Sequence, residues 1–267
     1  MSVLCVVVDV KGVTQLHDVV FVVCWPSSAI LRFNATTHQR LTDIDAEDLQ
    51  LPQFPQDIAA CEQTSHVYVV EFRKCIWRMS ADGADSKHWL PKSRDDTFRP
   101  WSLSVTSTRL LVTSPDTEQL MEFDAEGNEL RRVHLSDYMK PFHAVESPTG
   151  TFIVGHINTQ LEQDQVSEVN TGGEVLRQFT GSRLSSLGEP AHVAVDSHGN
   201  IFVADCNNRR ILLLDAHLTL RRVIIDEHQL NYKQPRRLCY REQSGQLLVG
   251  LYGGFTGNSV SVFDVVD

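Results

Sequence analysis

The sequence predicts an all-β fold: a six-bladed β-propeller of four-stranded antiparallel blades. Two observations carry this prediction, a recurring proline and a recurring set of short apolar runs separated by turn residues. Five prolines keep an approximate register, because positions 55, 100, 141, 190 and 235 are separated by 45, 41, 49 and 45 residues. A period in this range, built of strands and turns, is typical of a propeller, in which each sheet covers the faces of its neighbours.

Each unit contains the same succession of strands. The first strand after each proline reads DIAAC, WSLSV, FHAVE, AHVAV or RRLCY, and the more apolar second strand reads VYVVE, RLLVTS, TFIVGH, NIFVAD or QLLVGL. Gly150, Gly199 and Gly245 stand between them, where a tight hairpin favours positive φ. Third strands such as RILLLD and charged fourth strands such as LRRVII follow, and charge on an outer strand discourages edge-to-edge pairing.

Residues 12–44 repeat the scheme without the proline, as GVTQL, VVFVVC, AILRFN and QRLTDI. We therefore predict one domain, residues 1–267, with blades at roughly 11–52, 53–97, 98–139, 140–188, 189–233 and 234–267. The last unit has only three strands of its own. Its outer strand is expected to be SVLCVVVDV, residues 2–10, so that the two ends of the chain close the ring.

The composition disfavours several classes of protein. The formal net charge is −10, whereas general nucleic-acid binding depends on Lys and Arg. The cysteines at positions 5, 24, 61, 75, 206 and 239 lack the paired spacing of zinc sites. The apolar run at 3–8 is too short for a signal peptide, and no stretch approaches the roughly 18 residues of a membrane span. We expect a cytoplasmic monomer that contacts neither DNA nor a membrane.

One stretch carries a family resemblance. Residues 190–211, PAHVAVDSHGNIFVADCNNRRI, resemble an NHL repeat. The chain is similar to the propellers of tripartite-motif (RING) ubiquitin ligases and to divergent stand-alone NHL proteins of invertebrates. The resemblance implies a non-enzymatic protein-recognition or scaffold propeller, which selects substrates where a ligase is attached. No RING-type cysteine spacing or heptad segment is present, so a ligase link would depend on another chain or on another part of the gene.

Propellers bind at the mouth of the central channel, where the loops that lead into the innermost strands converge. The second residue after each proline marks one ring position there, and the residue before it marks another. The predicted binding residues are Asp57, Arg99, Trp101, Ser102, Phe142, His143, His192, Arg236 and Arg237. Aromatic, imidazole and guanidinium groups of this kind are enriched at recognition hot spots.

Two other functions compete with protein recognition. Single-stranded RNA binding would use Arg99, Arg236 and Arg237. A metal-dependent lactonase or lyase would need a channel metal, and Asp57, His143 and His192 are of the right residue types. We favour instead the interpretation that each histidine bonds a neighbouring blade's backbone, since Asp57 lies two blades from His143. No catalytic motif is found, and we predict no cofactor, no metal and no enzymatic activity.

Three further interpretations concern local roles. Asp205 is expected to cap a turn by accepting hydrogen bonds from turn amides. His156 is expected to be a turn residue, and the four tryptophans to pack between blades.

Overall fold

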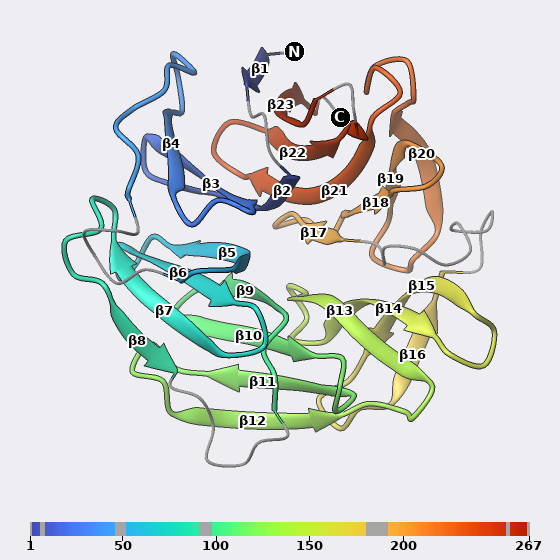
Figure 1. Cartoon of the computed structure of the whole chain (residues 1–267). Helices are drawn as coiled ribbons and strands as arrows, with labels where there is room; N and C mark the ends of the chain where they lie inside the picture. The colour runs from blue at the N-terminus through green and yellow to red at the C-terminus, as the bar shows by residue number, and fades with distance from the viewer. Residues whose placement is uncertain are drawn as a thin grey trace.

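The computed structural model contains six β-sheets arranged around a central channel (Figure 1). It describes residues 2–5, 9–45, 52–90, 98–179, 192–254 and 257–265. Within these ranges the regular elements are strands, and none is a helix long and apolar enough to cross a membrane. The predicted six-bladed propeller of antiparallel sheets is confirmed.

The second to fifth blades each contain four strands, and the order of these strands from the channel to the outer edge is their order in the chain. The second has β5 (Pro55–Cys61), β6 (His66–Glu71), β7 (Cys75–Ser80) and β8 (Lys87–Leu90). The third has β9 (Ser102–Thr106), β10 (Arg109–Ser114), β11 (Gln119–Phe123) and β12 (Glu129–His134). The fourth has β13 (Met139–Glu146), β14 (Phe152–Asn158), β15 (Gln163–Val169) and β16 (Val175–Gln178). The fifth has β17 (Val193–Val195), β18 (Ile201–Asp205), β19 (Arg210–Leu214) and β20 (Leu220–Ile225).

The first blade has three regular strands, β2 (Asp9–Leu16), β3 (Val19–Trp25) and β4 (Ile30–Asn34). Where the sequence predicts a fourth strand, Arg40 and Ile44 form isolated bridges to Phe33 and Ile30. The outer edge of this blade is therefore paired at two points instead of along a ladder.

The sixth blade is closed by the start of the chain. Its own strands are β21 (Gln234–Arg241), β22 (Gln246–Tyr252) and β23 (Ser259–Asp264), and β1 (Ser2–Cys5) pairs antiparallel with β23. This closure is as predicted, but the strand is shorter than 2–10. Asp9 and Val10 instead pair with Trp25 and Cys24 and so begin the innermost strand of the first blade.

Hydrophobic side chains fill the spaces between blades. The buried hydrophobic residues of the described ranges form six clusters, and each cluster combines residues of two adjacent blades. In the closing cluster Leu4 and Val262 of the sixth blade meet Val22 and Phe33 of the first. Each blade is thus covered on both faces, which explains the continuous apolar runs of the second and third strands.

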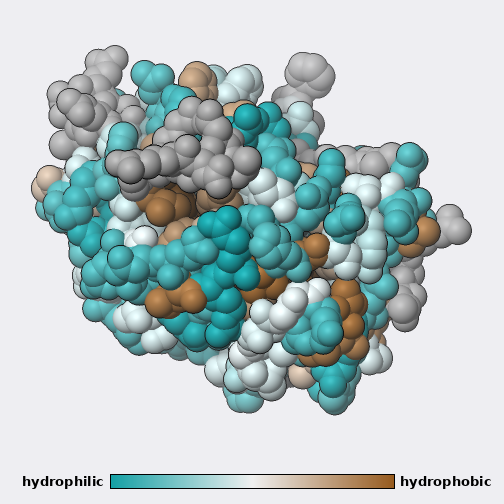
Figure 2. All heavy atoms as spheres, turned by 90° about the horizontal axis from the view of Figure 1, so that it is seen from below, coloured by the Kyte–Doolittle hydropathy of each residue, from teal (hydrophilic) through white to brown (hydrophobic). Residues whose placement is uncertain are grey.

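The outer strands face solvent and are polar. In β12 and β20 most residues are exposed, and the exposed hydrophobic ones, such as Leu130, are separated by Arg and Glu side chains. Seen from the edge of the disc near β12, hydrophilic residues cover most of the surface and hydrophobic ones appear as separate patches (Figure 2).

Four innermost strands contain a β-bulge at equivalent places. The register shifts at Lys11 in β2, Gln56 in β5, Phe142 in β13 and Arg236 in β21. Three of these bulges directly follow the recurring proline. Proline is tolerated in an innermost strand because this strand is an edge of its sheet, where the missing N–H of the proline removes no hydrogen bond between strands. A bulge re-aims the side chains beside it, so both the bulged residue and the next one can reach the channel.

Candidate functional site at the channel mouth

The residues at the predicted ring position converge inside the channel. Asp57, Ser102, His143 and His192 are all buried, with at most 8% of each exposed. One carboxylate oxygen of Asp57 and one ring nitrogen each of His143 and His192 lie within 4.8 Å of one another. We predicted that Asp57, two blades from His143, would be too far away to share a site with it, and this was wrong, because the channel is narrow enough for groups to meet across it.

Several ring residues hold the neighbouring blade. The Val193 amide donates to His143 Nδ1 at 3.4 Å, and the Leu238 amide donates to His192 Nδ1 at 3.3 Å. Asp57 Oδ2 accepts from the Ser102 hydroxyl at 2.5 Å and from the Leu103 amide at 3.1 Å. The expected hydrogen bonds from histidine to a neighbouring backbone are therefore present.

These bonds define the protonation of the two imidazoles. Burial lowers the pKa of His143 to about 3, and burial also lowers the pKa of His192 well below its usual value, helped by His143 and Arg237. Both rings are therefore neutral at pH 7 and carry one proton. Because Nδ1 accepts an amide hydrogen in each ring, that proton is on Nε2. The rings stack, with centroids 3.5 Å apart.

Asp57 and Arg237 are the acidic and the basic residue at the ring position. Burial raises the pKa of Asp57, while the Arg237 charge and the hydrogen bonds to the carboxylate lower it. Arg237 Nε donates to the Lys11 carbonyl and Nη1 donates to the Arg236 carbonyl, which ties the sixth blade to the first. Arg237 Nη2 has no hydrogen bond to another described residue.

The Asp57–His143–His192 cluster fits a metal ion poorly. Coordination through Nε2 requires that nitrogen to lose its proton, and a neutral imidazole would then carry it on Nδ1. In both histidines a proton on Nδ1 would point at the backbone N–H from which Nδ1 now accepts a hydrogen bond, so that hydrogen bond would be lost. The Arg237 guanidinium already supplies a positive charge that influences all three groups.

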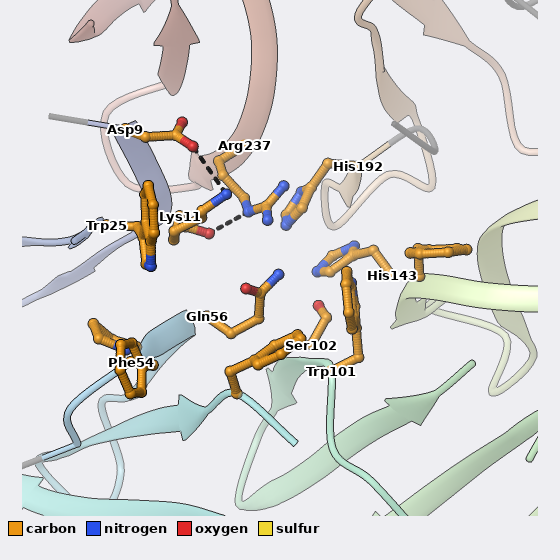
Figure 3. A pocket seen from close by; sticks show the side chains of 13 residues that line it. Asp9, Lys11, Trp25, Phe54, Gln56, Trp101, Ser102, His143, His192 and Arg237 are labelled. Atoms are coloured by element: carbon orange, nitrogen blue, oxygen red, sulfur yellow. Dashed lines mark hydrogen bonds and ion pairs between the residues drawn. The ribbon is translucent and has the colours of Figure 1, made fainter. Parts of the chain in front are cut away.

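Above this ring lies a pocket of about 550 Å³. Aromatic side chains from four blades surround it, namely Trp25, Phe54, Phe72, Trp101 and Phe142. Trp101 meets both Phe72 and Phe142 edge to face, with ring centroids 5.6 and 5.3 Å away. Trp25 is 51% exposed and Phe54 is 45% exposed. We call these five side chains the aromatic collar, and Figure 3 shows Trp25, Phe54 and Trp101 around Gln56, the histidines and Arg237.

The basic residues of the mouth are engaged with partners. Lys11 pairs with Asp9 at 2.9 Å, and Arg236 lies 3.6 Å from Asp9 and stacks over Tyr252 at 3.7 Å. Arg99 lies 3.7 Å from Asp116. Of the three arginines predicted for RNA binding, Arg99 and Arg236 thus lie in separate ion pairs, and Arg237 donates to two backbone carbonyls.

The two ends of the channel differ in charge. The pocket at the mouth is lined by Lys11, Arg237 and Asp9, whereas a pocket of about 860 Å³ at the opposite end has one basic residue, Arg241. The acidic residues of that opposite pocket are Asp57, Glu62, Glu146, Asp196 and Glu242. An anionic ligand is therefore favoured at the mouth and disfavoured at the other end.

Six of the nine predicted binding residues line the mouth pocket: Trp101, Ser102, Phe142, His143, His192 and Arg237. Asp57 lines the opposite pocket, and Arg99 and Arg236 line neither. The prediction missed Asp9, Lys11, Trp25, Phe54, Pro55, Gln56 and Phe72. Trp25 and Phe72 share a signal, because each directly follows the position equivalent to Asp205 at the end of a second strand.

Several local interpretations need correction. Trp25 is exposed at the mouth, whereas Trp77 and Trp89 do pack in the core. His156 lies within β14, fully buried, with Nε2 2.9 Å from the Ser167 hydroxyl, and is not in a turn. Asp205 does anchor its turn, but it accepts from the side chains of Asn208 and Arg210, at 2.9 and 2.7 Å.

Fold and site together define a six-bladed β-propeller with an aromatic-lined pocket at one mouth of its channel. Residues 187–212 match the NHL repeat family, and this match and the ring together support an NHL β-propeller. Of the matched residues, 187–191 lie outside the described ranges. No curated protein is similar enough in sequence to count as a relative.

Two solved structures share the fold. Hydrazine synthase of Kuenenia stuttgartiensis has a TM-score of 0.66 and 14% identity, over 96% of this chain and 83% of that chain. A catalytically inactive virginiamycin B lyase from Staphylococcus aureus, with quinupristin, has a TM-score of 0.66 and 12% identity, over 96% and 80%. At these identities the likeness is one of fold alone.

Proposed function

We propose that this propeller is a non-enzymatic protein-recognition module that binds a segment of a partner protein at the channel mouth. The observation that carries the proposal is the aromatic collar around a pocket of about 550 Å³. Large aromatic side chains that keep much of their surface exposed, as Trp25 does, are typical of interface hot spots. NHL propellers generally mediate protein binding, which agrees with this assignment.

The other two functions have less support. RNA binding needs a run of available cations, whereas Arg99 and Arg236 each form an ion pair with a carboxylate. A metal-dependent lyase needs unprotonated ligand nitrogens, whereas both channel imidazoles present Nε2–H. In the tripartite-motif family that the repeat resembles, such a pocket selects a substrate for ubiquitin transfer. We extend that role to this chain as the finer proposal.

A peptide array with free carboxyl ends tests the binding function. We expect a subset of peptides to bind the protein and to lose at least tenfold in affinity on Trp25→Ala or Trp101→Ala. The matched control is Leu130→Ala, because Leu130 is exposed to the same degree (52%) but lies on β12 at the outer edge. Absence of binding, or equal losses in the control, would contradict the proposal.

A further inference from the structure

We propose that the floor of the mouth pocket is a carboxylate site, so that the bound segment presents a carboxylate beside an apolar side chain. This inference rests on the proposed recognition function and names the chemistry of its ligand. The floor consists of Gln56, His143, His192 and Arg237, which come from four different blades and point toward one another (Figure 3).

The first support is a set of hydrogen-bond donors without acceptors. His143 and His192 are about 95% and 92% buried, and in both the protonated Nε2 has no hydrogen bond to any described residue. Gln56 is also about 92% buried, and its side-chain amide has no hydrogen bond within the described ranges. The three residues are largely buried, yet their side chains line the mouth pocket. A ligand in that pocket that supplies acceptor oxygens would give these donors the partners that polar groups of largely buried residues normally have.

The second support is the positive net charge of the residues that line the mouth pocket. The pocket is lined by two cations, Lys11 and Arg237, and by one carboxylate, Asp9, in a chain whose formal net charge is −10. Arg236 lies beside Asp9 and leaves that carboxylate between two cations. A carboxylate at the floor could accept from Arg237 Nη2 and from the neutral donors, and hydrogen bonds to a charged group are stronger than neutral ones.

The carboxylate of Asp57 lies close to the floor histidines, and its oxygens already have hydrogen-bond partners. They accept from the Ile58 amide at 2.9 Å, the Ser102 hydroxyl at 2.5 Å and the Leu103 amide at 3.1 Å. Asp57 lines the pocket at the opposite end and not the mouth pocket. Burial raises the pKa of Asp57, and the Arg237 charge and these hydrogen bonds offset only part of that rise. The hydrogen bonds of Asp57 join the second blade to the third.

The collar defines the rest of the ligand. A group that reaches the floor must pass between the rings of Trp25, Trp101 and Phe142, which offer apolar faces and edges. A carboxylate next to an apolar side chain matches both the polar floor and the aromatic collar. The carboxyl end of a peptide with a hydrophobic last residue has this chemistry. An acidic side chain flanked by hydrophobic residues has the same chemistry.

The direct test uses N-acetyl-L-phenylalanine and its neutral amide as probes, with binding followed by calorimetry and by the side-chain NMR signals of Gln56, His143 and His192. We expect the acid to bind at least tenfold more tightly than the amide and to shift all three sets of signals. Gln56→Leu should weaken the acid about tenfold, since one hydrogen bond to a charged group is lost, and Leu130→Ala should change nothing. Equal binding of acid and amide, no binding of the acid at millimolar concentration, or tighter binding of inorganic phosphate overturns the carboxylate site.

Peptides from the array separate this inference from the proposed function and identify the source of the carboxylate. Loss of binding on amidation of the carboxyl end assigns the site to a terminal carboxylate, and loss on replacement of an internal Glu by Gln assigns it to a side chain. Peptides that tolerate both changes overturn the carboxylate inference and leave protein recognition intact. If no peptide binds, protein recognition itself fails. Stoichiometric Zn²⁺ binding that is abolished by His143→Gln would overturn the donor assignment.

Discussion

Gly12 shows how one residue sets the distance between two blades. It occupies the ring position of the first blade, and a Cβ there would lie 2.8 Å from both the amide nitrogen and Cγ2 of Ile58. We expect Gly12→Ala to lower the free energy of unfolding by about 1–3 kcal/mol, because the second blade must shift. Urea denaturation measures this. Gly172→Ala is the control, since its Cβ would meet only the Asn170 side chain, at 3.3 Å; equal losses would contradict the close approach at Gly12.

The buried histidines predict a pH dependence of stability. Burial lowers the pKa of His143 to about 3 and of His156 to about 4, and places that of His192 well below its usual value. The unfolded chain therefore takes up protons below about pH 6.5 that the native state excludes, and stability falls as the pH falls from 6.5 toward 4. Each imidazole should contribute about 1.4 kcal/mol per pH unit in that window.

Unfolding free energies measured at several pH values between 7 and 5 check this. The three imidazoles should together take up about three protons on unfolding near pH 5.5, and the raised pKa of Asp57 acts in the opposite direction. His156→Gln should reduce the uptake by about one. The variant also loses a hydrogen bond to Ser167, so the slope and not the absolute stability is the informative quantity. A stability that does not change between pH 7 and 5 would contradict neutral buried rings.

Among the strands, an ion-pair network joins the third and fourth blades. Arg109 of β10 lies 2.8 Å from Glu122 of β11 and 2.7 Å from Glu146 of β13, and Glu122 is only 3% exposed. Arg109→Met should cost about 3 kcal/mol of unfolding free energy, because it removes the nearer cation from a buried carboxylate. Arg132→Met is the control, since the Arg132–Glu129 pair is exposed and should change stability by less than about 1 kcal/mol. Similar costs for the two variants would contradict the network.

The strands were predictable from the sequence because their apolar runs and turn glycines recur with a regular period. The β-bulges were not, since a bulge adds one residue to a strand without changing its composition. Gln56 was therefore not among the predicted binding residues, although the bulge brings it to the floor of the pocket. The six predicted residues that line the mouth pocket lie one or two positions after a recurring proline, where the register is marked in the sequence.

At the scale of the whole molecule, closure depends on a short segment at the start of the chain. Leu4 of β1 is 1% exposed and belongs to the cluster between the sixth and first blades. Leu4→Ala should lower the free energy of unfolding by about 2–5 kcal/mol through the cavity it leaves. Val3, 50% exposed on the same strand, gives the control, and Val3→Ala should cost much less. A mild effect of Leu4→Ala would contradict the closure.

The ring also explains what the sequence left open about the site. Asp57, His143 and His192 are far apart along the chain, and only the closed circle of blades brings them within 4.8 Å. Their residue types are compatible with either a metal or a set of donors. The choice between these depends on which atoms the next blade's amides occupy, and that is a property of the tertiary structure.

The most direct test is therefore the nitrogen NMR spectrum of the histidine rings in the intact protein at pH 7. Nitrogen shifts and ring couplings distinguish Nδ1–H, Nε2–H, doubly protonated and metal-bound imidazole. The account predicts that His143 and His192 are both neutral with the proton on Nε2, and that Zn²⁺ leaves their signals unchanged. A proton on Nδ1 of either ring, or signals that move with one equivalent of Zn²⁺, would contradict the assignment of the channel mouth as a donor site.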